Sequence, residues 1–279
     1  MFIDPILFKF EVFVVVCLGL IVGSFLNMVI YRLKNGGKLA LDRSRCTKCK
    51  KELGILDLIP VLSFLLLKGR CRYCKKKISW QYPIVELATG IIFVFIFLNT
   101  ELLKNNIPIL GGSSSLIIFA FSALVTAALI IIFVYDLKYY LIPDIVLTPS
   151  IVISVLFFLV LATLGGSYPL LSNLLGALIF SGFFFFQYAI SKGKWVGGGD
   201  IKLGLLLGFV LGWKLSILAL ILAYVSGSII ALTLIALKKK TRKDILPFGP
   251  FLIASSFICM FFGGAIINWY LNYFLTHSF

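Results

Sequence analysis

Long apolar runs recur along the chain and are separated by short polar segments. Most are close to the roughly 20 residues that a helix needs to cross the hydrocarbon layer of a membrane. We therefore predict an all-α polytopic membrane protein with about eight transmembrane helices. The predicted spans are residues 10–32, 84–99, 114–135, 145–165, 169–190, 201–213, 215–237 and 250–274. The second is short for a span and the sixth is shorter still.

Composition supports the same class. Of the 279 residues, 61% are hydrophobic and 13% are charged, and the mean hydropathy is +1.08. Soluble domains are about half apolar and a quarter charged. This balance excludes a soluble enzyme.

The basic residues indicate an orientation. The formal net charge is +15, and 22 of the 26 Lys and Arg residues fall in alternate polar segments. Because cytoplasmic loops retain basic residues, we predict that the N-terminus lies outside and that these segments face the cytoplasm. There they can meet anionic lipid headgroups, so the charge does not indicate a nucleic-acid partner. These patterns do not predict an oligomeric state.

Four of the six cysteines lie in one polar insertion between the first two spans. Cys46 and Cys49 form one CxxC pair, and after 21 intervening residues Cys71 and Cys74 form another. Two such pairs supply the four thiolates of a closed tetrahedral zinc site. Disulfides are disfavoured in the cytoplasm, and free or redox-active thiols are the alternative.

These features predict three regions. They are a first transmembrane helix (1–33), a small zinc-ribbon-like cytoplasmic insertion (34–83) and a transmembrane bundle (84–279).

Acidic residues at the ends of spans are candidates for chemistry, because a charged side chain in a membrane is expensive. Asp136 ends the third span, and Asp200 begins the sixth after three glycines. If the two carboxylates face each other, they can share one proton, as in aspartic proteases. The alternative for Asp200 is a helix cap, which Asp also favours.

Several motifs together resemble the bacterial type IV prepilin peptidases, which are membrane aspartic proteases of the GxGD type. These motifs occur in family order over nearly the whole chain. They are GSFLNMVIYRL at 23–33, the two CxxC pairs, KGRCRYC at 68–74, ISWQYPIVE at 78–86, DLKYYLIPD at 136–144, GGGDIKL at 197–203 and LPFGPFL at 246–252.

The resemblance implies a bifunctional enzyme of the bacterial inner membrane. Such enzymes remove the leader of type IV prepilins or pseudopilins at the cytoplasmic face. They then N-methylate the new N-terminal residue, usually Phe, with S-adenosylmethionine. The family's catalytic aspartates fall on Asp136 and Asp200, and the insertion resembles the methyltransferase part. Asp144 is the alternative catalytic acid, with a helix cap as its other role.

The motifs identify the residues that would contact the methyl donor less clearly than they identify the aspartates. Gly69 and Glu86 are the candidates, because a bare backbone and an interfacial carboxylate could both serve a cationic sulfonium cofactor. Packing is the alternative role for Gly69, and a buried polar link to the first span, for example to Asn27, is the alternative for Glu86. Two rival functions remain: a peptidase without methylation, and a zinc-ribbon-bearing transporter or scaffold.

Overall fold

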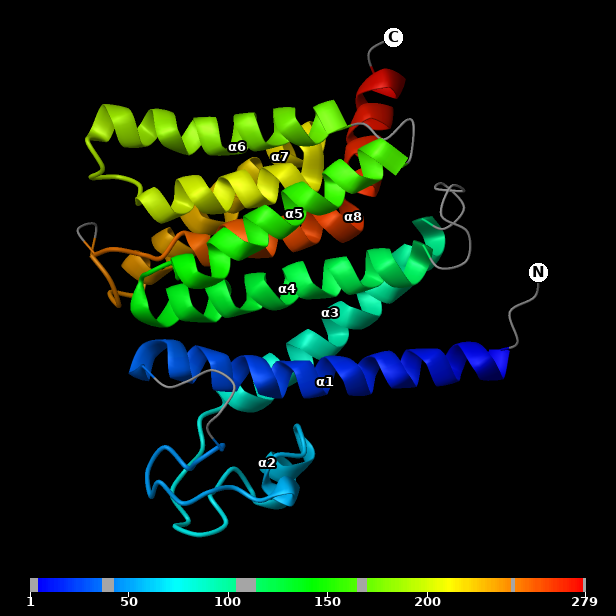
Figure 1. Ribbon diagram of the computed structural model, residues 1–279. Helices are drawn as coiled ribbons and strands as arrows, with labels where there is room; N and C mark the ends of the chain where they lie inside the picture. Colours follow the sequence, from blue (N-terminus) through cyan, green and yellow to red (C-terminus); the bar gives the residue numbers. More distant parts are fainter. Residues whose placement is uncertain (1–4, 37–42, 104–113, 165–169, 242–243, 278–279) are drawn as a thin grey trace. The chain divides into compact units, whose positions relative to one another are not determined.

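The computed structural model describes residues 5–36, 43–103, 114–164, 170–241 and 244–277, and these residues are helical apart from loops, turns and two isolated bridges (Figure 1). The long helices are α1 (Pro5–Asn35), α3 (Gln81–Leu103), α4 (Ser114–Tyr139), α5 (Asp144–Leu164), α6 (Leu170–Ser191), α7 (Gly198–Ala236) and α8 (Gly249–His277). The insertion carries the 3-10 turn η1 (Ile55–Asp57) and the short helix α2 (Leu62–Leu66).

Seven helices of the described part are long and apolar enough to cross a membrane. This confirms the predicted all-α polytopic membrane protein. Helix α3 includes the short second predicted span (84–99) and extends beyond it at both ends, to 23 residues in all. The predicted limits at residues 165 and 169 lie outside the described residues.

The chain forms two compact units, Met1–Ile131 and Ile132–Phe279, with the boundary inside α4. In the first unit, α1 and α3 are packed with their backbones in close contact. A Cβ atom on Gly19 would lie 2.7 Å from the Cα of Gly90, and one on Gly23 would lie 2.7 Å from the Cα of Glu86. Glycines four residues apart allow this approach between membrane helices. The pair α1–α3 carries the cysteine insertion between its members.

In the second unit, α6 and α7 lie side by side (Figure 1) and make a similar glycine contact. A Cβ atom on Gly208 would clash with the carbonyl oxygen of Gly176, and one on Gly204 would lie 3.2 Å from the carbonyl oxygen of Phe180. Higher residue numbers on α6 therefore meet lower numbers on the first part of α7. The two segments run antiparallel.

Helix α7 reverses direction at Gly212, whose φ of 73° and ψ of 171° are not helical. Its 39 residues would extend about 58 Å as a straight helix, roughly twice the hydrocarbon thickness. After Gly212 the chain returns along α6, since Gly212 lies by Ser172 whereas Tyr224 hydrogen-bonds with Gln187. The two predicted spans 201–213 and 215–237 thus correspond to the two parts of α7.

A polar side chain compensates for the break. The reversal removes the helical partner of the Phe209 carbonyl, and the Asn173 amide of α6 donates to that carbonyl at 2.6 Å. A buried carbonyl without a donor would be costly in a membrane.

The α6–α7 contact yields a stability prediction. Replacing Gly208 with Ala should lower the free energy of unfolding by about 1–3 kcal/mol, because the methyl group forces two backbones apart. Thermal or SDS-induced unfolding of the purified protein in detergent measures this effect.

Gly182→Ala on α6 is the matched control, since a Cβ atom there meets nothing within 4 Å. The control should be neutral or slightly stabilising, because Ala favours helix over Gly. Equal stability of the two variants would contradict the packing described for Gly208.

Candidate active site and metal centre

The four cysteines of the insertion meet at one point. Their Sγ atoms all lie within 4.8 Å of one another, and those of Cys46 and Cys74 are 4.0 Å apart. Four thiolates at this spacing could hold one tetrahedral metal ion with bonds of about 2.3 Å. The structure therefore brings together the cysteines that the CxxC spacing predicted.

Two turns of the same form hold these thiols. In the first turn, the Cys46 amide donates to the Lys51 carbonyl, and the Lys50 amide donates to the Cys46 carbonyl. In the second turn, the Cys71 amide donates to the Lys76 carbonyl, and the Lys75 amide donates to the Cys71 carbonyl. The residue after each second cysteine has a positive φ, 61° at Lys50 and 57° at Lys75. Each CxxC segment is thus a tight knuckle with its two thiols on one side.

The surroundings favour the thiolate form of Cys46. Burial opposes ionisation of this thiol, but the backbone N–H groups of Cys49 and Lys48 and the neighbouring thiols lower its pKa to about 6. A deprotonated thiol is the form that binds metal.

Asp57 links the two halves of the insertion. Its carboxylate accepts hydrogen bonds from Arg72 Nε at 2.6 Å and from the Gly54 amide at 3.1 Å. Burial of Asp57 opposes its ionisation, yet these bonds hold the pKa of the carboxyl below its usual range. The pair connects η1 to the second knuckle.

Gly69 occupies the turn that joins α2 to the second knuckle. Its φ is +67°, and a Cβ atom would lie 3.0 Å from the ring of Phe64. Its amide donates to Phe64, and its carbonyl accepts from Ile78. Turn geometry and packing, the alternative role for Gly69, are enough to explain a glycine at this position, and its contact with the methyl donor stays a prediction.

Glu86 lies inside the first unit and ties the insertion to both helices. It is 6% exposed, its Oε2 accepts a hydrogen bond from the Val61 amide at 2.7 Å, and it interacts with the Ser24 side chain of α1. Val61 has φ 61°, which a β-branched residue adopts only at a cost. The Glu86 carboxylate thus stabilises a strained turn directly before α2.

Asn27 of α1 makes a separate link. It contacts Gln81 and the Tyr82 carbonyl at the start of α3, not Glu86. The polar link of Glu86 to the first span therefore runs through Ser24.

Asp136 and Asp200 both lie in the second unit. Asp136 is in the last turn of α4 and is 5% exposed. The backbone N–H of Gly249, the first residue of α8, donates to its carboxylate. A Cβ atom on Gly249 would lie 2.5 Å from Oδ2 of Asp136, so a side chain at this position would displace the carboxylate.

Asp200 is in the first turn of α7, where its Oδ2 accepts a hydrogen bond from the Gly197 amide at 3.2 Å. Gly197, not Asp200, is the N-cap residue of this helix. The Asp200 carboxylate thus stabilises the helix start from the third helical position and not as the N-cap residue itself, and it remains partly exposed.

The two carboxylates occupy one small region. A Cβ atom on Gly199 would lie 3.1 Å from Ile142, and one on Gly249 would lie 3.7 Å from the same side chain. Gly199 directly precedes Asp200, and Gly249 donates to Asp136. The two acids are close enough to interact electrostatically. Two carboxylates that share a site cannot both ionise freely and can hold one proton between them.

Asp144 has a different partner. It is the first residue of α5, and its carboxylate forms an exposed ion pair with Lys202 at 2.9 Å. Its contacts are those of a helix-end residue.

Sequence reasoning missed two neighbours of the acids. One is Gly249, whose motif LPFGPFL carried the resemblance without an assigned role. The other is Tyr224, which hydrogen-bonds with Gln187 and lies within electrostatic range of Asp200. Its ring packs on that of Phe248, with 4.8 Å between the ring centroids. No spacing signal connects either residue to Asp136 or Asp200 in the sequence.

Comparison with known proteins places the chain in a family. Residues 17–100 match the model of the bacterial peptidase A24 N-terminal domain, and residues 123–232 match that of the type IV leader peptidase family. A protein of Aeromonas salmonicida named prepilin leader peptidase/N-methyltransferase is 32% identical over 91% of each chain. The chain belongs to the type IV leader peptidase family.

Other members with the same name come from distant bacteria. The one from Bacillus subtilis is 34% identical over 91% of this chain and 95% of its own, and the one from Legionella pneumophila is 30% identical over 95% and 96%. No solved structure matches the present chain significantly. The two family models cover the cysteine insertion and both candidate aspartates.

The thiol cluster yields a prediction about metal content. Cys71→Ser should remove the bound metal ion, because a hydroxyl replaces one of four thiolates. The measurement is metal per chain by elemental mass spectrometry after purification without added metal.

Cys259→Ser is the matched control, since Cys259 is a buried thiol on α8 outside the cluster. It should leave the metal content unchanged. Metal retained in full by Cys71→Ser would contradict the assignment.

Proposed function

We propose that this chain removes the leader of type IV prepilins or pseudopilins with Asp136 and Asp200 and then N-methylates the new N-terminal residue. One observation carries the proposal. Two carboxylates from α4 and α7 lie in one region of a chain whose relatives, over nine-tenths of its length, are named prepilin leader peptidases/N-methyltransferases.

The proposed cleavage uses the pair as acid and base. The ionised carboxylate takes a proton from a water molecule, whose oxygen attacks the carbonyl carbon after the last leader residue. The protonated carboxyl donates its proton to the carbonyl oxygen. Collapse of the tetrahedral intermediate breaks the C–N bond, and the leaving amine takes up a proton.

Backbone donors orient both acids for this task. Gly249 donates to Asp136, and Gly197 donates to Asp200. Both donors lie at helix starts, where backbone N–H groups have no partner within the helix. The remaining acceptor positions are available for water and substrate.

The metal of the cysteine cluster is proposed to be structural zinc. Four thiolates fill the coordination sphere of Zn²⁺ and leave no open position for catalysis. Zinc would hold the two knuckles of the insertion together.

The proposed methyl donor is S-adenosylmethionine, and the insertion is the proposed methyltransferase part. Gly69 and Glu86 stay predictions as contacts of this cofactor. The carboxylate of Glu86 already has partners in Val61 and Ser24. A peptidase without methylation is therefore the second candidate.

The transporter or scaffold alternative receives no support. It requires acids near the middle of spans, whereas Asp136 and Asp200 lie in terminal turns of their helices. For the orientation, we propose a bacterial inner-membrane protein with its N-terminus outside and both acids at the cytoplasmic face, from the distribution of basic residues.

Co-expression with a prepilin tests both activities together. The wild-type chain should shorten the prepilin by its leader and add one methyl group to the new N-terminus, as intact mass and N-terminal peptide mass spectrometry would report. Asp136→Asn and Asp200→Asn should each lower leader removal by about 10²–10⁴-fold, the usual contribution of a general acid or base.

Asp144→Asn is the control. It removes only an exposed ion pair, worth about 0–1 kcal/mol, and should retain cleavage and metal content. Leader removal that survives in Asp200→Asn would overturn the mechanism, and cleavage without methylation would select the second candidate.

The role of Gly249 yields a further prediction. Gly249→Ala should lower leader removal at least about tenfold, because the methyl group displaces the Asp136 carboxylate that the helix start holds. Kinetics with purified prepilin in detergent measure kcat and KM separately, and the loss should fall on kcat.

Gly264→Ala on the same helix is the control, since nothing lies within 4 Å of a Cβ atom there. The control should match the wild-type kcat and should accumulate to the same level. A Gly249→Ala variant with full kcat would show that α8 does not position Asp136.

A further inference from the structure

The insertion exposes a set of large apolar side chains, here called its apolar face. Its members are Ile55 (87% exposed), Leu56 (66%), Leu62 (57%), Leu65 (60%), Leu66 (82%) and Trp80 (67%). They are neighbours, because η1 contacts α2, and Trp80 packs on Phe64 of α2 with 5.0 Å between ring centroids. An apolar patch of this kind on a folded domain marks an interaction site.

Hydrogen bonds fix the depth of this face along the spans. Val61, directly before α2, is bonded to Glu86, five residues into α3 and so about 7.5 Å inside the start of that helix. Glu86 also contacts Ser24, which precedes the end of α1 by about 16 Å. Helix α2 therefore lies beside the C-terminal half of α1 and not beyond its end, as Figure 1 also shows.

This level corresponds to the boundary between headgroups and acyl chains. Helix α1 is about 46 Å long, whereas the hydrocarbon layer is about 30 Å thick, so its last turns reach the headgroups. An apolar segment at the level of the preceding turns would then meet lipid. Amphipathic segments of membrane proteins sink about 5–10 Å into this boundary.

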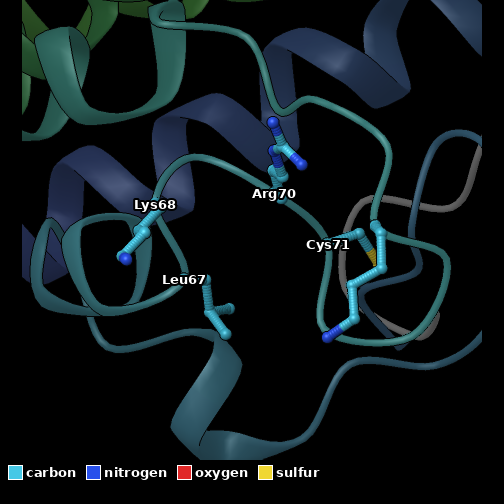
Figure 2. Close-up of a pocket in the computed structure, with 5 residues that line it drawn as sticks. Leu67, Lys68, Arg70 and Cys71 are labelled. Atoms are coloured by element: carbon cyan, nitrogen blue, oxygen red, sulfur yellow. The ribbon is translucent and has the colours of Figure 1, made fainter.

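Basic residues follow directly after α2 and line a hollow of about 400 Å³. Its lining residues are Leu67, Lys68, Arg70, Cys71 and Lys75, and none of them is acidic. Figure 2 shows Leu67, Lys68, Arg70 and Cys71 along one loop that curves around the hollow. Phosphate groups suit such a site, and lipid headgroups supply them at this depth.

We propose that η1 and α2 form an interfacial anchor that seats the insertion on the membrane leaflet where α1 ends. Ile55, Leu56, Leu62, Leu65, Leu66 and Trp80 enter the acyl boundary, and Lys68, Arg70 and Lys75 contact anionic headgroups. The anchor is a second membrane contact of the insertion, in addition to its covalent links to α1 and α3. It holds the metal knuckles at the membrane surface.

Photocrosslinking of the full chain in lipid nanodiscs tests the anchor. Benzoylphenylalanine at position 66 should form adducts with acyl chains, which mass spectrometry identifies by the added lipid mass. The same probe at position 48 is the control, since Lys48 is exposed on the first knuckle, which contributes no residue to the apolar face or to the hollow. Metal content of both proteins confirms that the insertion has folded.

The lipid composition tests the basic hollow. With mixed phosphatidylglycerol and phosphatidylcholine, the position-66 probe should favour the anionic lipid. Lys68→Gln and Arg70→Gln should each reduce this preference about fivefold, the effect of one basic residue near an anionic surface. An unchanged preference in the double variant would overturn the headgroup contact.

Two outcomes at position 66 would overturn the anchor itself. One is a lipid adduct no stronger than at position 48. The other is a crosslink to a second copy of this chain in place of lipid, which would make the apolar face a protein interface. Neither outcome depends on leader cleavage, so the anchor and the proposed activity are tested separately.

Discussion

Every backbone N–H and C=O group within the hydrocarbon layer must find a partner in the protein, because lipid supplies none. This constraint leaves helices as the elements of the described bundle and confines free polar groups to helix ends. The break at Gly212 obeys it as well, since Asn173 occupies the carbonyl that the reversal frees. The candidate catalytic acids lie at helix ends, where backbone groups need no partner within the helix. The free N–H groups at the starts of α7 and α8 hold Asp200 and Asp136.

The insertion faces a different constraint. Among its described residues, Phe64 and Cys71 are the buried apolar ones, which is too small a core for an independent domain of about 50 residues. A tetrathiolate metal site can replace such a core, because metal binding contributes directly to folding. The Asp57–Arg72 pair and the Glu86–Val61 bond add fixed points outside the cluster. The loop is thus stabilised by a few directional contacts and rests against α1 and α3.

Several residues in this chain have two roles, which makes single-residue interpretation from sequence difficult. Asp200 stabilises the start of α7 and also interacts electrostatically with Asp136. Gly69 and Glu86 were candidates for the methyl donor on chemical grounds, and the structure assigns each a mechanical role in placing α2. A residue that suits a cofactor chemically can thus also be needed for folding, and spacing cannot separate the two roles.

The sequence by itself determined the features that depend on local periodicity and spacing. These are the apolar spans, the all-helical membrane class, the division of residues 201–237 near Gly212, and the two CxxC pairs whose thiols do meet. Motifs also pointed to Asp136 and Asp200. The contacts around these residues came only from the tertiary structure. Three of these contacts join residues 24 to 113 positions apart in the chain. They are Gly249 at the start of α8 with Asp136, Tyr224 with Asp200, and the Val61 amide with Glu86. Such contacts depend on how helices cross, and although glycines such as Gly176 and Gly208 allow close backbone approach, the sequence does not say which helices meet there.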